Sequence, residues 1–223
     1  THYGLCWWSV AVLLSLPGIG LWRAYAAGRL GINPLERLTD MTGRWALVIF
    51  LVSLAVTPLR RLLRLAMIRL GAGYGKRLSD WNPLIRMRRM IGLFCFAYAC
   101  AHVIVFIWLD QGLAITGILL EMREKPYLLA GAAAFLLLIP VALTSNTASM
   151  RCLGRWWRRL HRLVYPAGVL VVLHYLWLCK PGVREAWPYA GVLAGLLVAR
   201  LWIWLGFRVR CSPDNGMEVP ERR

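Results

Sequence analysis

Long apolar runs, separated by shorter stretches rich in arginine, dominate the pattern along the chain. A helix needs roughly 17 to 25 mostly apolar residues to cross a bilayer. Six runs meet that requirement, and we expect them to form transmembrane helices at about 5–26, 44–62, 90–109, 127–144, 163–179 and 186–207. The first run is too long for the apolar core of a signal peptide, so it is counted as a helix. The pattern predicts an all-α integral membrane protein with six transmembrane helices, forming a single domain over residues 1–223.

The basic residues are divided unevenly between the two sides that these runs define. Eighteen Lys and Arg residues fall on the side with the 60–89 loop, the 145–162 loop and the C-terminal tail, against eight on the other side. Loops rich in Lys and Arg face the cytoplasm. We therefore expect both termini to be cytoplasmic.

Composition supports the membrane class and excludes other classes. Of 223 residues, 59% are hydrophobic and only 17% are charged, although the net charge is +17. That charge could indicate nucleic-acid binding, but the basic residues lie between apolar runs rather than on one basic domain. Six cysteines are spread out without a C-x-x-C pair, so no zinc or disulfide framework is expected.

Two of the four histidines lie inside apolar runs, His102 in the third and His174 in the fifth. Each is twelve or thirteen residues from the cytoplasmic start of its run, or ~18–20 Å at ~1.5 Å per residue. Both rings should therefore share one depth in the outer half of the bilayer. Two such histidines can hold a haem iron from both sides and leave no open position, which suits electron transfer. Taken alone, either could instead be a packing histidine that bonds to a backbone carbonyl.

His161 lies at the cytoplasmic edge of the fifth run, thirteen residues and ~20 Å from His174. A second haem at that level needs a ligand from the third run, where Arg88 and Arg89 stand instead. Three roles stay open for His161. It could be a second or alternative iron ligand, an interfacial histidine beside lipid headgroups, or a contact for quinone or flavin.

Several short segments, taken as a set, resemble the YedZ/MsrQ family of haem-bearing membrane subunits, part of the ferric reductase-like transmembrane group. They occur in family order at 42–47 (TGRWAL), 57–61 (TPLRR), 88–103 (RRMIGLFCFAYACAHV), 125–131 (KPYLLAG), 160–165 (LHRLVY) and 173–177 (LHYLW). NADPH oxidases, whose membrane part is related to this group, carry two histidines on the third helix, whereas this chain has only His102 there. The resemblance implies a haem, and a second haem would lack its histidine on the third helix.

The resemblance implies further properties that the residues do not themselves give. The family's histidines correspond to His102, His161 and His174, and its haem is of the b type. The resemblance also implies FMN, electrons from the quinone pool, and a periplasmic molybdenum-containing methionine sulfoxide reductase as partner. The protein would then be an electron-transfer subunit, not the catalytic one, in a bacterial inner membrane.

Two other functions compete with electron transfer. A small polytopic transporter should show repeat halves and polar groups near the midplane, but here only histidines lie there. A plain membrane anchor would carry no redox chemistry. If electrons leave on the outer side, we expect the docking face to include Asn33-Pro34 and the 110–126 segment with Glu121 and Glu124. A haem absorption band would separate electron transfer from both alternatives.

Overall fold

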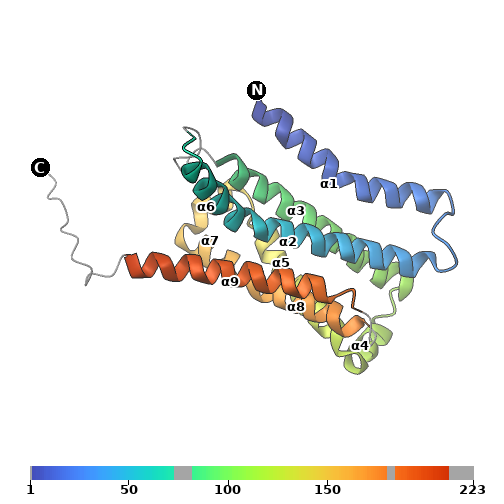
Figure 1. Ribbon diagram of the computed structural model, residues 1–223. Helices are drawn as coiled ribbons and strands as arrows, with labels where there is room; N and C mark the ends of the chain where they lie inside the picture. Colours follow the sequence, from blue (N-terminus) through green and yellow to red (C-terminus); the bar gives the residue numbers. More distant parts are fainter. Residues whose placement is uncertain (1, 73–81, 180–183, 211–223) are drawn as a thin grey trace, which may run out of the picture.

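Helices make up all the regular structure in the parts of the chain that the computed structural model describes, residues 2–72, 82–179 and 184–210 (Figure 1). The all-α prediction is therefore confirmed for these residues. In chain order the elements are α1 (His2–Ala26), α2 (Pro34–Arg69), α3 (Asn82–Ile104) with its π-helical continuation η2 (Val105–Asp110), α4 (Ile115–Glu124), α5 (Pro126–Leu143), α6 (Thr147–Leu153), α7 (Arg155–Leu160), the 3-10 turn η3 (His161–Leu163), α8 (Val164–Leu178) and α9 (Trp187–Arg210).

Five helical segments in the described part of the chain are long and apolar enough to cross a membrane. They are Trp7–Ala26, Pro34–Arg69, Leu84–Asp110, Pro126–Leu143 and Trp187–Leu205. The predicted run at 163–179 forms α8, whose 15 residues are only ~22 Å long at ~1.5 Å per residue. The chain is thus a multi-pass membrane protein. Six crossings and cytoplasmic termini remain predictions.

Two helix pairs form the centre of the bundle: α2 packs along α3, and α5 packs along α8. The core follows one face of α2, where Ile49 and Leu54 are almost completely buried. Gly168 on α8 allows a close approach, because a Cβ there would lie 2.8 Å from the Phe50 ring. α1 lies on the α3 side of the bundle and α9 on the opposite side (Figure 1). Large apolar side chains on both outer helices are exposed, as expected for a surface in lipid.

A tyrosine ties α1 to the bundle at the proline inside that helix. The Tyr98 hydroxyl donates a hydrogen bond to Leu14 O at 2.9 Å and accepts one from Gly18 N–H at 2.8 Å. These two backbone groups are four residues apart and would pair directly in a regular helix. Pro17 lies between them, inside α1. Insertion of a side chain into the helical ladder beside a proline is a recognised cause of bending.

Two elements differ from the sequence expectations. α2 begins ten residues before the predicted run at 44–62, because Pro34 suits a first helical position and an Asp40–Arg44 pair at i,i+4 spacing stabilises the polar first turns. The 110–126 segment lies outside the six predicted transmembrane runs, but it contains the helix α4. Ten residues cannot span a bilayer, so a search for long apolar runs misses this helix.

Candidate functional site

The fold brings His102 and His174 together from α3 and α8. Their ring centroids lie 6.3 Å apart, and the ring planes are inclined at 81°. The two histidines, which residue counting placed at one depth, therefore also lie close together in space. His102 is followed within one turn by the π-helical segment η2, and such segments are frequent at functional sites.

Each ring is fixed by one hydrogen bond to a backbone carbonyl. His102 Nδ1 lies 2.9 Å from Thr39 O on α2, and His174 Nδ1 lies 2.7 Å from Tyr127 O on α5. A carbonyl oxygen only accepts, so each Nδ1 must carry the proton and donate it. In a neutral ring, Nε2 then keeps its lone pair. This is the tautomer and the support that metal-ligating histidines have.

Two glycines make room for these rings. A Cβ at Gly43 on α2 would lie 3.0 Å from the Cε1 and Nδ1 atoms of His102. A Cβ at Gly131 on α5 would lie 2.7 Å from His174 Nδ1, a distance that real Cβ atoms essentially never show. Each ring thus rests on the backbone of the helix next to its own. Both glycines belong to segments singled out in the sequence, TGRWAL and KPYLLAG.

The pair fits a haem iron in spacing and in donor set. Metal–imidazole nitrogen bonds are roughly 2 Å, so two rings that ligate one ion from opposite sides have centroids about 6 Å apart. The observed 6.3 Å agrees. Among the described residues, no group of three or more His, Cys, Asp or Glu side chains could hold a metal ion. Two histidine ligands suffice for haem, because the porphyrin supplies the other four nitrogens.

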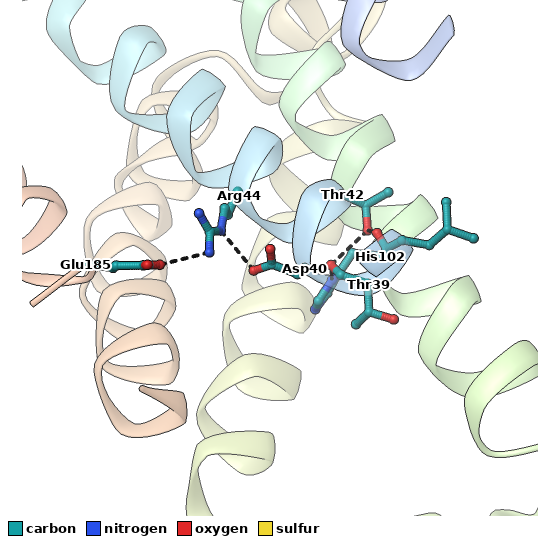
Figure 2. A network of polar contacts seen from close by, with 7 residues as sticks. Thr39, Asp40, Thr42, Arg44, His102 and Glu185 are labelled. Atoms are coloured by element: carbon teal, nitrogen blue, oxygen red, sulfur yellow. Dashed lines mark hydrogen bonds and ion pairs between the residues drawn. The ribbon is translucent and has the colours of Figure 1, made fainter. Parts of the chain in front are cut away.

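A polar network borders the site at the end of the bundle where His102 lies (Figure 2). Arg44 bonds to Asp40 Oδ1 and to Glu185 Oε2, each at 2.9 Å, and so joins α2 to the segment before α9. Asp40 is the neighbour of Thr39, whose carbonyl holds His102. The three charged side chains are between 38% and 58% exposed, so each pair contributes less than about 1 kcal/mol to stability. Of the three, Asp40 interacts electrostatically with His102.

His161 lies apart from this pair, on the 3-10 turn η3. Its Nδ1 bonds to Trp157 O at 3.1 Å, its Nε2 lies 3.4 Å from Ser145 Oγ, and its ring stacks on Trp157 with centroids 3.9 Å apart. Burial lowers the pKa of His161 below its ordinary value, and the bond to Trp157 O opposes this effect. These contacts suit an interfacial histidine. The ligand role remains a prediction.

Sequence reasoning missed four supports of the site. The Thr39 and Tyr127 carbonyls are backbone atoms, so they leave no mark on residue identity. Gly43 and Gly131 carry a signal, since a glycine inside a helix without a turn often marks close approach of another group. That signal does not identify a histidine as the group.

Comparison with known proteins identifies the family. Residues 42–172 match the family model described as "Ferric reductase like transmembrane component". The chain is 41% identical over 202 residues to the "Protein-methionine-sulfoxide reductase heme-binding subunit MsrQ" of Xanthomonas campestris pv. campestris (strain 8004), with 90% of this chain and 85% of the relative covered. It is also 41% identical over 204 residues to the protein of the same name from Ralstonia nicotianae, with 90% and 87% covered. No solved structure matches. The chain therefore belongs to the ferric reductase-like transmembrane family and, within it, to the YedZ/MsrQ family.

Proposed function

We propose that this protein is the b-type haem electron-transfer subunit of a methionine sulfoxide reductase system, with His102 and His174 as the axial ligands. The observation that carries the proposal is the ring pair itself. The centroids are 6.3 Å apart, and both Nδ1 atoms are committed to backbone carbonyls. The matching relatives are named heme-binding subunits, which supports the same cofactor here.

The chain's residues bind and orient the haem, which supplies one-electron redox chemistry when bound. His102 and His174 would present Nε2 to the iron, while Thr39 and Tyr127 fix the tautomer and raise the basicity of the rings. If His102 and His174 both held the iron, it would have no open position for oxygen or substrate. The protein therefore passes electrons on and leaves catalysis to a partner.

The quinone pool is the proposed electron donor. An open apolar groove of about 430 Å³ lies between α2 and α9 and includes Leu51, Val52 and Tyr189. Tyr189 contacts Tyr175, with ring centroids 5.6 Å apart, and the buried Tyr175 hydroxyl has no hydrogen-bond partner among the described residues. Tyr175 follows His174 directly in the chain. A groove open to lipid, with an available hydroxyl behind it, supports entry of a quinol from the bilayer.

The proposed acceptor is a periplasmic molybdenum-containing methionine sulfoxide reductase subunit. The histidine pair is near the ends of α3 and α8 that the distribution of basic residues assigns to the periplasm. Glu124 is exposed on α4 and is available for docking there. Glu121 is bonded to Lys125, and this bond raises the pKa of Lys125. The system would operate in a bacterial inner membrane and repair oxidised periplasmic proteins.

FMN and the role of His161 complete the proposal. The family resemblance implies FMN, and His161 at the opposite end of α8 is a candidate contact for it or a second or alternative iron ligand. Its hydrogen bonds to Trp157 and Ser145 make it the less favourable ligand of the three histidines.

Visible spectra of purified variants test the haem assignment. His102→Ala and His174→Ala should each abolish the low-spin haem spectrum, because one axial ligand cannot maintain it. His161→Ala is the matched control and should keep the haem. An unaltered low-spin spectrum in either of the first two variants would refute the pairing. Absence of haem from the wild-type protein would favour a transporter or an anchor.

A further inference from the structure

Arg200 is a cation inside the apolar span of α9, and its hydrogen-bond partners in the described structure are all neutral. Its Nη1 donates to the Tyr165 hydroxyl at 2.6 Å and its Nη2 donates to Leu54 O at 2.6 Å. The carbonyl of Leu54 is available because Pro58, four residues later in α2, has no N–H. The Nε atom of Arg200 is buried without a hydrogen-bond partner in the described structure. Charged groups in a membrane helix are costly and usually mark a functional site.

A second arginine, Arg88 on α3, bonds to Thr57 on α2, three residues after Leu54, whose carbonyl binds Arg200. The two guanidinium groups therefore contact neighbouring turns of α2, and their charges repel each other. The Arg88 Nη1 atom donates a long hydrogen bond of 3.5 Å to Thr57 Oγ1. Arg88 also repels the charged form of His161. Two turns beyond Thr57 on α2, the buried Nε of Arg64 likewise has no partner in the described structure. The inner end of the bundle thus gathers positive charge from α2, α3 and α9.

No carboxylate of the described residues neutralises this charge. All six described Asp and Glu residues belong to the opposite end of the bundle, namely Glu36, Asp40, Asp110, Glu121, Glu124 and Glu185. Buried charges in proteins are normally paired. Within the described part of the chain, this site has guanidinium donors and no acid, so we expect its anion to be a ligand.

We propose that Arg88 and Arg200 bind one phosphate group at the inner end of the bundle. Guanidinium groups match phosphate in geometry, with paired N–H donors. The Tyr165 hydroxyl accepts from Arg200, so its own proton is free to be donated to the same phosphate. Arg88 lies fourteen residues before His102 on α3, or ~21 Å along the helix, so the phosphate site is separate from the histidine pair.

Two sources supply this chemistry on that side of the membrane. One is the headgroup of an anionic phospholipid, since basic pockets between transmembrane helices bind such headgroups. The other is a soluble phosphomonoester, of which the FMN in the proposed function is an example. The site rests on the arginines alone and does not depend on the haem assignment.

Binding to the purified, haem-loaded full chain in a non-ionic detergent tests the proposal. The probes are phosphatidylglycerol, phosphatidylcholine with the same acyl chains, and FMN, measured by native mass spectrometry and, for FMN, by fluorescence. We expect one phosphatidylglycerol or one FMN per chain, and no retention of phosphatidylcholine. Retention of the lipid alone assigns the site to a headgroup, whereas FMN binding that inorganic phosphate displaces assigns it to a soluble phosphomonoester.

Matched variants separate a specific site from general attraction to positive charge. Arg88→Gln should weaken binding roughly tenfold or more, the effect of one charge-assisted hydrogen bond. Arg89→Gln removes the same charge from the exposed neighbouring position and should bind like the wild type. In Arg88→Glu the new carboxylate should pair with Arg200 and abolish phosphate binding. The thermal stability of this variant should then not change when the probes are added. If Arg88→Gln does not fold, Arg88→Lys replaces it, because it keeps the charge but loses the planar fork.

Three results would overturn the phosphate site. They are equal retention of all three probes, equal losses in Arg88→Gln and Arg89→Gln, or loss of haem from Arg88→Gln with phosphate binding unchanged. The visible spectrum is read in the same samples. Failure of the phosphate site with a normal haem spectrum would therefore leave the proposed electron-transfer function standing.

Discussion

Replacing Gly131 with alanine should disrupt the support of His174 without touching a ligand. In a helix interior this change ordinarily stabilises by roughly 0.5–1 kcal/mol. Here the new Cβ would lie 2.7 Å from His174 Nδ1, so the ring or the helix must move. Overpacking of this kind costs about 1–3 kcal/mol, and the 2.7 Å bond to Tyr127 O would also be weakened. We expect the clash to outweigh the helix propensity.

Haem titration of the apoprotein measures the consequence of Gly131→Ala. Loss of an outer support typically weakens metal binding by about 10–100-fold, and that is the expected loss here. Gly195→Ala on α9 is the matched control, because a Cβ there meets nothing within 4 Å. It should bind haem like the wild type. Wild-type haem affinity in Gly131→Ala would show that the ring does not rest on this helix during binding and would refute the reasoning.

Three further predictions address other parts of the structure. Tyr98→Phe removes the hydroxyl that bonds to Leu14 O and Gly18 N–H, and it should destabilise the protein by about 1–2 kcal/mol. Hydrogen exchange in α1 should become faster, and unchanged exchange would contradict the role of the hydroxyl. Burial lowers the pKa of His161, so the folded state binds this proton less readily than the unfolded chain. The unfolding free energy should therefore fall as pH drops below about 6.5, and His161→Gln should remove that contribution. Reporter fusions after Lys125 should be periplasmic and those after Lys76 cytoplasmic; the reverse pattern would contradict the assigned orientation.

Hydropathy predicted the positions of the helices better than their full lengths. The run at 127–144 corresponds closely to α5 (Pro126–Leu143), where the apolar segment and the helix coincide. The run at 44–62 underestimates α2 at both ends, because that helix continues beyond the apolar run into turns that carry charged residues. The amphipathic helix α4 gave no signal of transmembrane length. Apolar runs report the part of a helix that lies in lipid, and the rest depends on capping, ion pairs and packing.

The histidine pair could be predicted because depth in a membrane helix follows from counting residues. His102 and His174 were placed at one level from their distance to the basic helix ends, and their ring centroids lie 6.3 Å apart in the structure. The contacts of Arg200 could not be predicted in this way, since the sequence does not show which residue an arginine in an apolar run will bind. Its partner depends on Pro58, whose missing N–H frees a carbonyl on another helix. Such long-range complementarity between a proline and an arginine becomes visible only in the folded bundle.

Low-temperature electron paramagnetic resonance of the oxidised, purified protein tests the central claim most directly. One iron held between two imidazoles whose planes are inclined at 81° should give a strongly anisotropic low-spin ferric signal, dominated by a single large g value. The signal should disappear in His102→Ala and in His174→Ala and persist in His161→Ala. A high-spin signal in the wild type, or a low-spin signal that survives either of the first two substitutions, would contradict ligation by this pair.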